Sequence, residues 1–415
     1  MPPIACRCSA RTVRVARFSR SDRFDLDYSF FGRAVLRYSR CTGFYKALSR
    51  IVFEGSAMSA RPFSTPFAER FGLRVPLVQA PMVGATTAAM VAAASNAGAL
   101  GSLGAGAFDP DRIAAEVDAI RAATDRPFAV NLFVLPDTAA DAATVARALA
   151  AIDPLNAALG LPPGTAPARY APDFRAQLDA LVALRVPVAS FTFGVLEAAD
   201  VARLKAAGTY VIGTATHVAE GLAWQAAGAD ALSAQGAEAG GHRGTFIGPA
   251  EHALIGTLAL VPQLVDATGL PVLAAGGIMD GRGIAAALAL GAQAAQLGTA
   301  FLPCAESAIA ADWKARLLAC DDTSTQVTRA ITGRHARGLR NALMTRLGER
   351  LDDVAPYPVQ NALTQPLRQA AARANDGDYL SLWAGQGAAL ARRRGDALTT
   401  AQLVDALAAE WRAAA

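Results

Sequence analysis

The chain has 415 residues, of which 53% are hydrophobic and 18% are charged, a composition that excludes a disordered chain. No run of eighteen or more apolar residues lacks a polar interruption, which excludes a membrane-spanning helix. The formal net charge is +4, but residues 1–57 alone carry eleven Lys/Arg against four Asp/Glu. The remaining residues are slightly acidic and show no basic stripe with interleaved aromatic residues, which argues against nucleic acid as a partner.

The five cysteines give no pattern typical of a disulfide framework or a metal site. Cys6 and Cys8 form a lone C-x-C without a second pair, so no zinc or other metal ion is expected. Unpaired cysteines are typical of a reducing compartment, and we therefore predict a cytoplasmic protein.

Residues 1–57 form an Arg- and Ser-rich extension without a clear helical or strand period. Two interpretations remain open: an organelle transit peptide, which Asp22, Asp25 and Asp27 weaken, or a start codon assigned too early, with Met58 opening the domain. We favour the second interpretation and expect the extension to be poorly ordered or loosely attached.

From Val75 onward, short apolar runs alternate with longer Ala-rich stretches of helical composition. Eight runs predict strands: 75–80, 99–103, 128–133, 187–193, 210–214, 231–235, 271–275 and 294–297. The stretches between them that predict helices are 85–97, 110–123, 195–207, 218–227 and 283–290. Nearly continuous apolar strands that alternate with helices are typical of a parallel sheet covered by helices.

Eight such units predict a closed (β/α)8 TIM barrel, an α/β fold. We place the barrel at residues 58–304. Residues 305–415 are predicted to be mainly helical and to form a cap over the barrel mouth, with a surface helix from Thr400.

Two glycine-containing loops follow the seventh and eighth predicted strands. One contains Gly276 and Gly277, and the other contains Gly298 and Thr299. Loops at this position of a barrel often bind phosphate through backbone N–H groups, and Thr299 adds a hydroxyl donor. Either loop alone is better explained as a simple turn, but the pair on consecutive strands favours a phosphate site.

His242 lies in a glycine-rich loop after the sixth predicted strand. The loop offers the imidazole little to pack against, so we interpret it as a catalytic base at the barrel mouth. A capping or purely ligand-binding histidine remains the alternative. His217 is expected to open a helix, His252 to lie where a helix begins, and His335 to lie in a basic helical segment.

Few other polar groups lie near the strand ends. Asn131 falls inside an apolar strand, Gln235 ends another, and Met82 follows the first. A buried amide needs several partners, so these side chains suit a ligand with ring nitrogens and carbonyls better than a metal ion.

Together these residues resemble a known family, the nitronate monooxygenases, formerly called 2-nitropropane dioxygenases. The resemblance covers about residues 66–394 and depends on the segments QAPM (79–82), NLF (131–133), AQGAEAGGHRG (234–244), AAGGI (274–278) and LGT (297–299). Two further segments, YPVQNALT (357–364) and LWAGQ (382–386), are similar to the class I branch.

The resemblance implies an FMN cofactor and the O2-dependent oxidation of a nitronate or nitroalkane to a carbonyl compound and nitrite. His242 would be the base, and Tyr357 would line the substrate pocket. The residues that would contact the cofactor are Met82, Asn131, Gln235, Gly240, Gly277, Gln296, Gly298 and Thr299. The partners would be the small nitro compound and O2, and the protein would be a monomer or homodimer.

One departure concerns the substrate pocket. Family members can place further Tyr and Lys residues after the position of Tyr357, where this chain has Asn361, Thr364 and Gln365. The alternatives are a flavin enzyme that uses NAD(P)H, such as an enoyl-acyl carrier protein reductase or a quinone reductase, and a barrel without flavin that binds a sugar phosphate.

Overall fold

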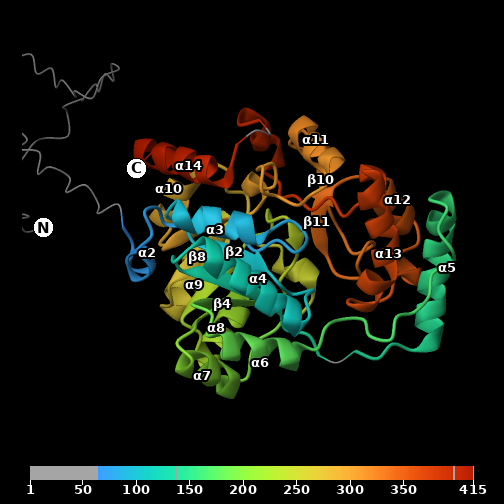
Figure 1. Cartoon of the computed structure of the whole chain (residues 1–415), viewed down its shortest axis with the longest axis horizontal. Coiled ribbons are helices and arrows are strands. Elements are labelled where there is room, and N and C mark those ends of the chain that lie inside the picture. Colours follow the sequence, from blue (N-terminus) through green and yellow to red (C-terminus); the bar gives the residue numbers. More distant parts are fainter. Residues whose placement is uncertain (1–63, 137, 396–397, 415) are drawn as a thin grey trace, which may run out of the picture. The chain divides into compact units, whose positions relative to one another are not determined.

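A computed structural model describes residues 64–136, 138–395 and 398–414 (Figure 1). The predicted extension 1–57 and Met58 lie outside the described residues. In the part of the chain that the model describes, no helix is both long and apolar enough to cross a membrane.

Eight parallel strands form the predicted barrel. Their order around the sheet is β1-β9-β8-β6-β5-β4-β3-β2, and a parallel bridge between Val78 and Leu100 joins the first strand to the last. The strands are β1 (Leu77–Gln79), β2 (Gly101–Gly104), β3 (Phe128–Phe133), β4 (Val188–Thr192), β5 (Tyr210–Ala215), β6 (Ala231–Gln235), β8 (Val272–Ala275) and β9 (Ala294–Leu297). The prediction of a (β/α)8 fold is therefore confirmed, and β3, β6 and β9 have the predicted bounds.

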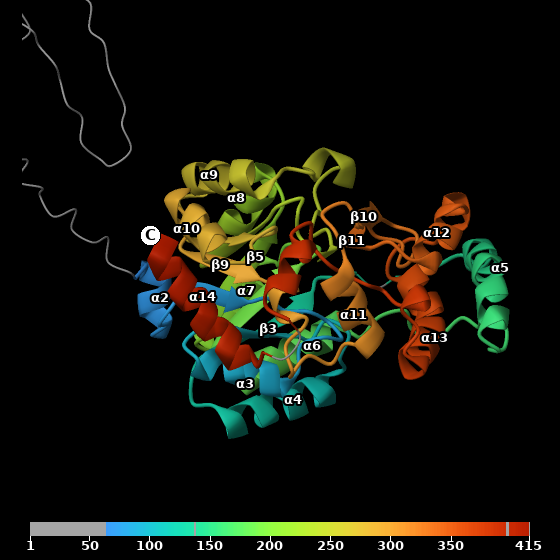
Figure 2. The same ribbon diagram turned by 90° about the horizontal axis from the view of Figure 1, so that it is seen from above.

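Helices cover the outer face of the barrel (Figures 1 and 2). In α4 the Asp109 carboxylate caps the first turn by accepting from the Arg112 N–H, and the helix buries Ile113, Val117 and Ile120 at helical spacing. The helices of this layer are α3 (Ala88–Asn96), α4 (Pro110–Ala123), α6 (Phe174–Leu184), α7 (Ala198–Ala206), α8 (Val218–Ala227), α9 (Thr257–Thr268) and α10 (Gly281–Ala289). The short helix α2 (Pro66–Phe71) does not belong to this layer, because its Phe67 packs against inward-facing strand residues such as Val78 and Leu273.

A second, three-stranded antiparallel sheet joins the barrel loops to the C-terminal segment. It consists of β7 (Gly241–His242), β10 (Thr325–Thr328) and β11 (Ala336–Leu339), in the order β10-β11-β7. The prediction that His335 lies in a helix is wrong, because His335 immediately precedes β11. The strand β11 that follows His335 pairs with β7, which is far away in the sequence. Local composition cannot predict such a partner.

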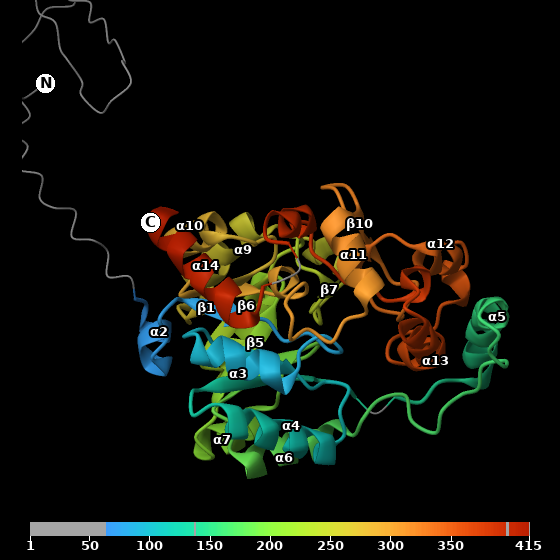
Figure 3. The same cartoon turned by 45° about the horizontal axis from the view of Figure 1, so that its top comes forward.

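A group of helices lies to one side of the barrel in all three views (Figures 1, 2 and 3). The group contains α5 (Ala142–Ala158), which belongs to the connection between β3 and β4, and α12 (Ala342–Gly348) and α13 (Val359–Ala374) from the C-terminal segment. Buried side chains of all three helices form one apolar cluster, so two distant parts of the sequence build this region together.

The remaining elements complete the C-terminal segment. α14 (Thr400–Ala414) begins at the predicted residue and lies against α10 and α3 (Figure 2). It buries Leu403, Val404, Leu407 and Trp411 in the main core. The others are α11 (Ala311–Ala319) and the 3-10 helices η1 (Ala250–Ala253), η2 (Thr299–Phe301), η3 (Leu351–Asp353), η4 (Gly377–Tyr379) and η5 (Ala388–Arg393).

Candidate active site

The two predicted phosphate loops lie side by side, because β8 and β9 are neighbours in the barrel. Gly276 and Gly277 have φ values of 121° and 74°, a backbone conformation that glycine adopts without strain. Among the described residues, nothing accepts a hydrogen bond from the N–H of Gly277 or of Gly298. These two donors therefore remain available for an anionic ligand at the carboxyl ends of the strands.

A C-terminal segment, Gly385–Gly387, covers these loops. The Gly385 N–H donates to Thr299 Oγ1 at 3.0 Å, and the Gln386 N–H donates to the Glu238 carbonyl at 2.9 Å. A Cβ on Gly385 would lie 2.7 Å from the Glu238 carbonyl oxygen, and a Cβ on Gly387 would lie 3.0 Å from the Gly277 carbonyl oxygen. Glycine is required at this close approach, and Thr299 keeps its hydroxyl proton for a ligand.

The other predicted cofactor residues lie at the same end of the barrel but differ in the hydrogen bonds that their side chains make within the protein. Asn131 Nδ2 donates to Ser190 Oγ at 2.9 Å, within the barrel. Gln235 Nε2 donates to the His242 carbonyl at 2.9 Å, and its Oε1 accepts from the Gly244 N–H at 2.7 Å. Gln235 therefore fixes the loop that carries His242.

Met82 and Gln296 have fewer partners. A Cβ on Gly298 would lie 3.5 Å from Met82 Sδ, so Met82 borders the Gly298 loop. The Gln296 amide makes no hydrogen bond with a described residue, and its side chain is half-buried. Among the predicted cofactor residues with an amide side chain, Gln296 therefore has both its donor and its acceptor available for a ligand.

His242 lies among three aromatic rings. The ring centroids of Phe193, Tyr357 and Trp383 lie 5.7, 5.4 and 5.4 Å from that of the imidazole. Nε2 lies 2.9 Å from Thr332 Oγ1. The expectation that the loop leaves His242 little to pack against is wrong, because its packing partners come from elsewhere in the chain. Phe193 directly follows β4, Thr332 lies in the β10–β11 hairpin, and Tyr357 and Trp383 lie further along the C-terminal segment.

This environment keeps the imidazole neutral. Burial, together with the positive charges of Arg334 and Arg368, lowers the pKa of His242 to about 3. A neutral imidazole at pH 7 can accept a proton, which is what a general base must do.

Two arginines hold the chain around His242, Arg243 from within the barrel loops and Arg334 from the segment between β10 and β11. Arg243 is 1% exposed, and its guanidinium donates to the carbonyls of Gly236 at 2.6 Å and Ala253 at 2.9 Å. Arg334 Nε donates to the Arg243 carbonyl at 3.0 Å, and its Nη2 donates to the Thr245 carbonyl. The backbone on both sides of His242 is therefore held from two directions.

The site is strongly cationic. Burial lowers the pKa of Arg334 and of Arg368 to about 10, so both remain charged at neutral pH. Neither forms an ion pair with a carboxylate of the described residues. Arg334 stacks on the Phe193 ring at 4.0 Å, and Arg368 Nη2 donates to the Asn361 carbonyl at 2.7 Å. Buried cations without anionic partners favour an anionic ligand.

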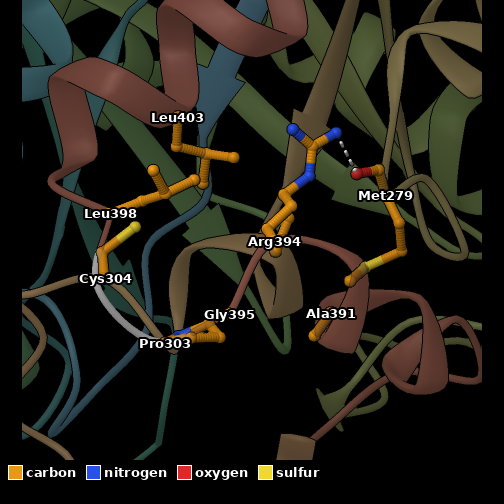
Figure 4. Close-up of a pocket in the computed structure, with 9 residues that line it drawn as sticks. Met279, Pro303, Cys304, Ala391, Arg394, Gly395, Leu398 and Leu403 are labelled. Carbon is orange, nitrogen blue, oxygen red and sulfur yellow. Dashed lines mark hydrogen bonds between the residues drawn. The ribbon is translucent and has the colours of Figure 1, made fainter.

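A separate small cavity lies beside α14 and η5 (Figure 4). Its volume is about 10 Å³, which is room for about one water molecule. Arg394 Nη2 donates to the Met279 carbonyl at its edge, and burial raises the pKa of the Cys304 thiol to about 12. This cavity is too small for a substrate. Its cysteine, Cys304, does not provide a reactive thiolate at neutral pH.

Two residues of this site, His242 and Tyr357, are predicted from the sequence, and they lie together in the structure. Five others have no site role predicted from the sequence: Phe193, Thr332, Arg334, Arg368 and Trp383. Trp383 lies in the LWAGQ segment, which resembled the family, but no local signal marked Thr332 or Arg368.

Comparison with known proteins agrees with this geometry. The family model described as "Nitronate monooxygenase" matches residues 64–410. A probable nitronate monooxygenase of Staphylococcus aureus (strain Newman) is 39% identical over 324 residues, which are 78% of this chain and 91% of that protein. The matched residues include both glycine loops and His242.

Solved structures show the same fold. The nitroalkane oxidase from Streptomyces ansochromogenes is 42% identical, with a TM-score of 0.76 over 84% of this chain and 98% of that chain. FabK from Thermotoga maritima is 28% identical, with a TM-score of 0.66 over 84% of this chain and 96% of that chain. The family match over most of the sequence and these likenesses establish that the chain belongs to the nitronate monooxygenase family.

Proposed function

We propose that this chain binds FMN at the barrel mouth and oxidises alkyl nitronates, and neutral nitroalkanes, with O2 to carbonyl compounds and nitrite. The observation that carries the proposal is the His242 imidazole near two arginines, Arg334 and Arg368, that have no carboxylate partner among the described residues, at the same end of the barrel as glycine loops with free N–H donors. An anionic nitronate suits the cations, and a neutral imidazole suits proton abstraction.

The residues present fit FMN. The free N–H groups of Gly277 and Gly298 and the Thr299 hydroxyl would hold the phosphate. The Gln296 amide and Asn131 would contact the rest of the cofactor, with Met82 and Gly240 beside them, while Gln235 supports the His242 loop. When bound, the flavin supplies the electron transfer to O2 that no protein side chain provides.

The protein contributes binding, orientation and one proton transfer. Arg334 and Arg368 attract the nitronate, and in the ligand-free site their positive charges lower the pKa of His242. The negative charge of the nitronate that forms on proton transfer offsets this effect. Phe193, Tyr357 and Trp383 pack against the half-buried imidazole and fix the position of its ring. With a neutral nitroalkane, His242 takes the α-proton, and with a preformed nitronate it has no proton to remove.

The test of this role compares the two forms of one substrate. In the FMN-loaded enzyme, His242→Asn should lower kcat/KM for nitroethane by about 100-fold or more. It should affect ethyl nitronate by less than about fivefold, because that substrate is already deprotonated. Oxygen consumption measures both rates. Equal losses with both substrates would remove His242 from the role of base.

The alternative is a flavin enzyme that is reduced by NAD(P)H, such as an enoyl-acyl carrier protein reductase or a quinone reductase. The similarity to probable nitronate monooxygenases at 39% and to a nitroalkane oxidase at 42% identity favours the oxygenase. Anaerobic mixing separates the two. Flavin that is bleached by NADH but not by a nitronate would contradict the proposal.

A further inference from the structure

Among the described side chains, the hydroxyl of Thr332 is the group that lies within hydrogen-bond distance of a ring nitrogen of His242. Thr332 is 1% exposed and lies in the loop that joins β10 to β11. Its Oγ1 lies 2.9 Å from His242 Nε2 and 3.4 Å from the Arg334 carbonyl oxygen. The position is far from His242 in sequence, 90 positions further along the chain.

The loop around Thr332 is held firmly. Thr364 Oγ1 donates to the Ile331 carbonyl at 2.9 Å, and the Gly333 N–H donates to the Arg329 carbonyl at 2.8 Å. Gly333 has a φ of 84°, and a Cβ there would lie 2.2 Å from the Ala355 carbonyl oxygen. The hydroxyl is therefore fixed in position by α13 on one side and by the hairpin on the other.

The proton count of the two contacts couples the tautomer of His242 to the hydrogen bond that Thr332 donates. A hydroxyl has one proton, and the Arg334 carbonyl can only accept it. If Thr332 Oγ1 donates to that carbonyl, it can only accept from His242, so Nε2 carries the ring proton. Nδ1 then holds a lone pair. Nδ1 has no hydrogen-bond partner among the described residues, and it is not one of their fully buried, unpartnered atoms, so part of its surface is accessible.

We propose that Thr332 is a positioning residue that fixes the Nε2–H tautomer of His242 and thereby makes Nδ1 the atom that accepts the substrate proton. This inference rests on the proposed function. The Cα–H bond of the nitroalkane breaks, an N–H bond forms at Nδ1, and the electron pair moves into a C=N bond with the charge on the nitro oxygens. Throughout, the Nε2–H continues to donate to Thr332, so the ring does not turn.

The kinetic experiment uses two variants of the FMN-loaded enzyme. Thr332→Val keeps the shape and removes the hydroxyl, and Thr332→Ser keeps the hydroxyl. We expect Thr332→Val to lower kcat/KM for nitroethane by about 10- to 100-fold and that for ethyl nitronate by less than about threefold. Thr332→Ser should stay within about threefold of the unmodified enzyme for both substrates.

The outcomes separate the inference from the proposed function. Equal losses for both substrates, no loss, or a Ser variant as slow as the Val variant would overturn the role of Thr332. An unmodified enzyme that oxidises ethyl nitronate but not nitroethane would overturn Nδ1 as a base and leave nitronate oxidation intact. An unmodified enzyme that oxidises neither would contradict the proposed function itself.

A spectroscopic measurement does not depend on turnover. In holoenzyme labelled with ¹⁵N-histidine, the His242 signals are assigned by their loss in His242→Asn, because the chain has only four histidines. We expect the proton on Nε2 in the unmodified enzyme and in Thr332→Ser, and a mixture of tautomers in Thr332→Val. A proton on Nδ1 in the unmodified enzyme would overturn the proposal.

Discussion

His242 shows how much a single residue depends on its surroundings. Its neighbours in sequence are glycines on one side and Arg243 on the other, which suggest an exposed loop. In the structure the imidazole lies against Phe193, Tyr357 and Trp383. The same burial that lowers its pKa to about 3 must also make the stability of the protein depend on pH.

The sign of that dependence follows from the two pKa values. The unfolded state protonates His242 below its ordinary pKa of about 6.5, while the folded state resists protonation down to about 3. Folding stability is therefore complete above pH 6.5 and is lost progressively as the pH falls toward 3. Between pH 7 and pH 5, the free energy of unfolding should fall by about 1–2 kcal/mol more in the unmodified protein than in His242→Gln.

Urea unfolding of both proteins at pH 7 and pH 5 measures this difference. The other three histidines are common to both proteins and cancel in the comparison. An identical loss of stability in the two proteins would show that His242 titrates normally in the folded state.

At the scale of elements, the glycines in the loops after β8 and β9 are needed for two different reasons. Gly276 and Gly277 are needed for their positive φ. Gly298 has a φ of −109°, which any residue adopts, and the nearest atoms to a Cβ there would be Ala80 Cβ and Met82 Sδ, both at 3.5 Å. The protein itself therefore leaves room for a Cβ at Gly298, and we expect the proposed phosphate to occupy that space.

Gly298→Ala should consequently affect the cofactor and not the fold. We expect the free energy of unfolding of the cofactor-free protein to change by less than about 0.5 kcal/mol. The Kd for FMN should rise about tenfold, which corresponds to about 1.4 kcal/mol. Flavin fluorescence titration measures this affinity.

Gly348→Ala is the matched control, because nothing lies within 4 Å of a Cβ at that helical position. It should change neither stability nor FMN affinity by a comparable amount. An unchanged affinity in Gly298→Ala would mean that the phosphate does not lie against Gly298.

At the scale of the whole molecule, the barrel and the C-terminal segment share one core. The main apolar cluster contains barrel residues together with Leu317, Leu382, Leu407 and Trp411. The active site is divided in the same way, since His242 comes from the barrel and Thr332 from the C-terminal segment. The predicted boundary at residue 304 therefore separates stretches of sequence that pack as one unit.

A single thermal transition should follow from this shared core. Differential scanning calorimetry of the FMN-loaded protein should give one peak, with a calorimetric enthalpy equal to the van't Hoff enthalpy. Flavin release and tryptophan fluorescence should change at the same temperature. Two separate peaks, with flavin released in only one of them, would contradict a common core.

A large part of the fold could be predicted from the sequence because its determinants are local. Apolar runs such as 128–133, 231–235 and 294–297 become strands with the predicted bounds, and the glycines of 276–277 and 298 lie where two neighbouring strands end. Strand periodicity, turn chemistry and helix composition act between neighbours in the chain. The position of the candidate phosphate site follows from them, since parallel strands place their carboxyl ends at one edge.

Only the tertiary structure decided what surrounds His242. Thr332 lies 90 residues away in sequence, and Tyr357 and Trp383 lie farther still. The β10–β11 hairpin pairs with β7 across a similar separation. No local pattern encodes which distant residues meet, because that is fixed by the packing of the whole chain. The sequence thus determined the barrel and the glycine loops, and the three-dimensional packing determined the protonation state of the histidine.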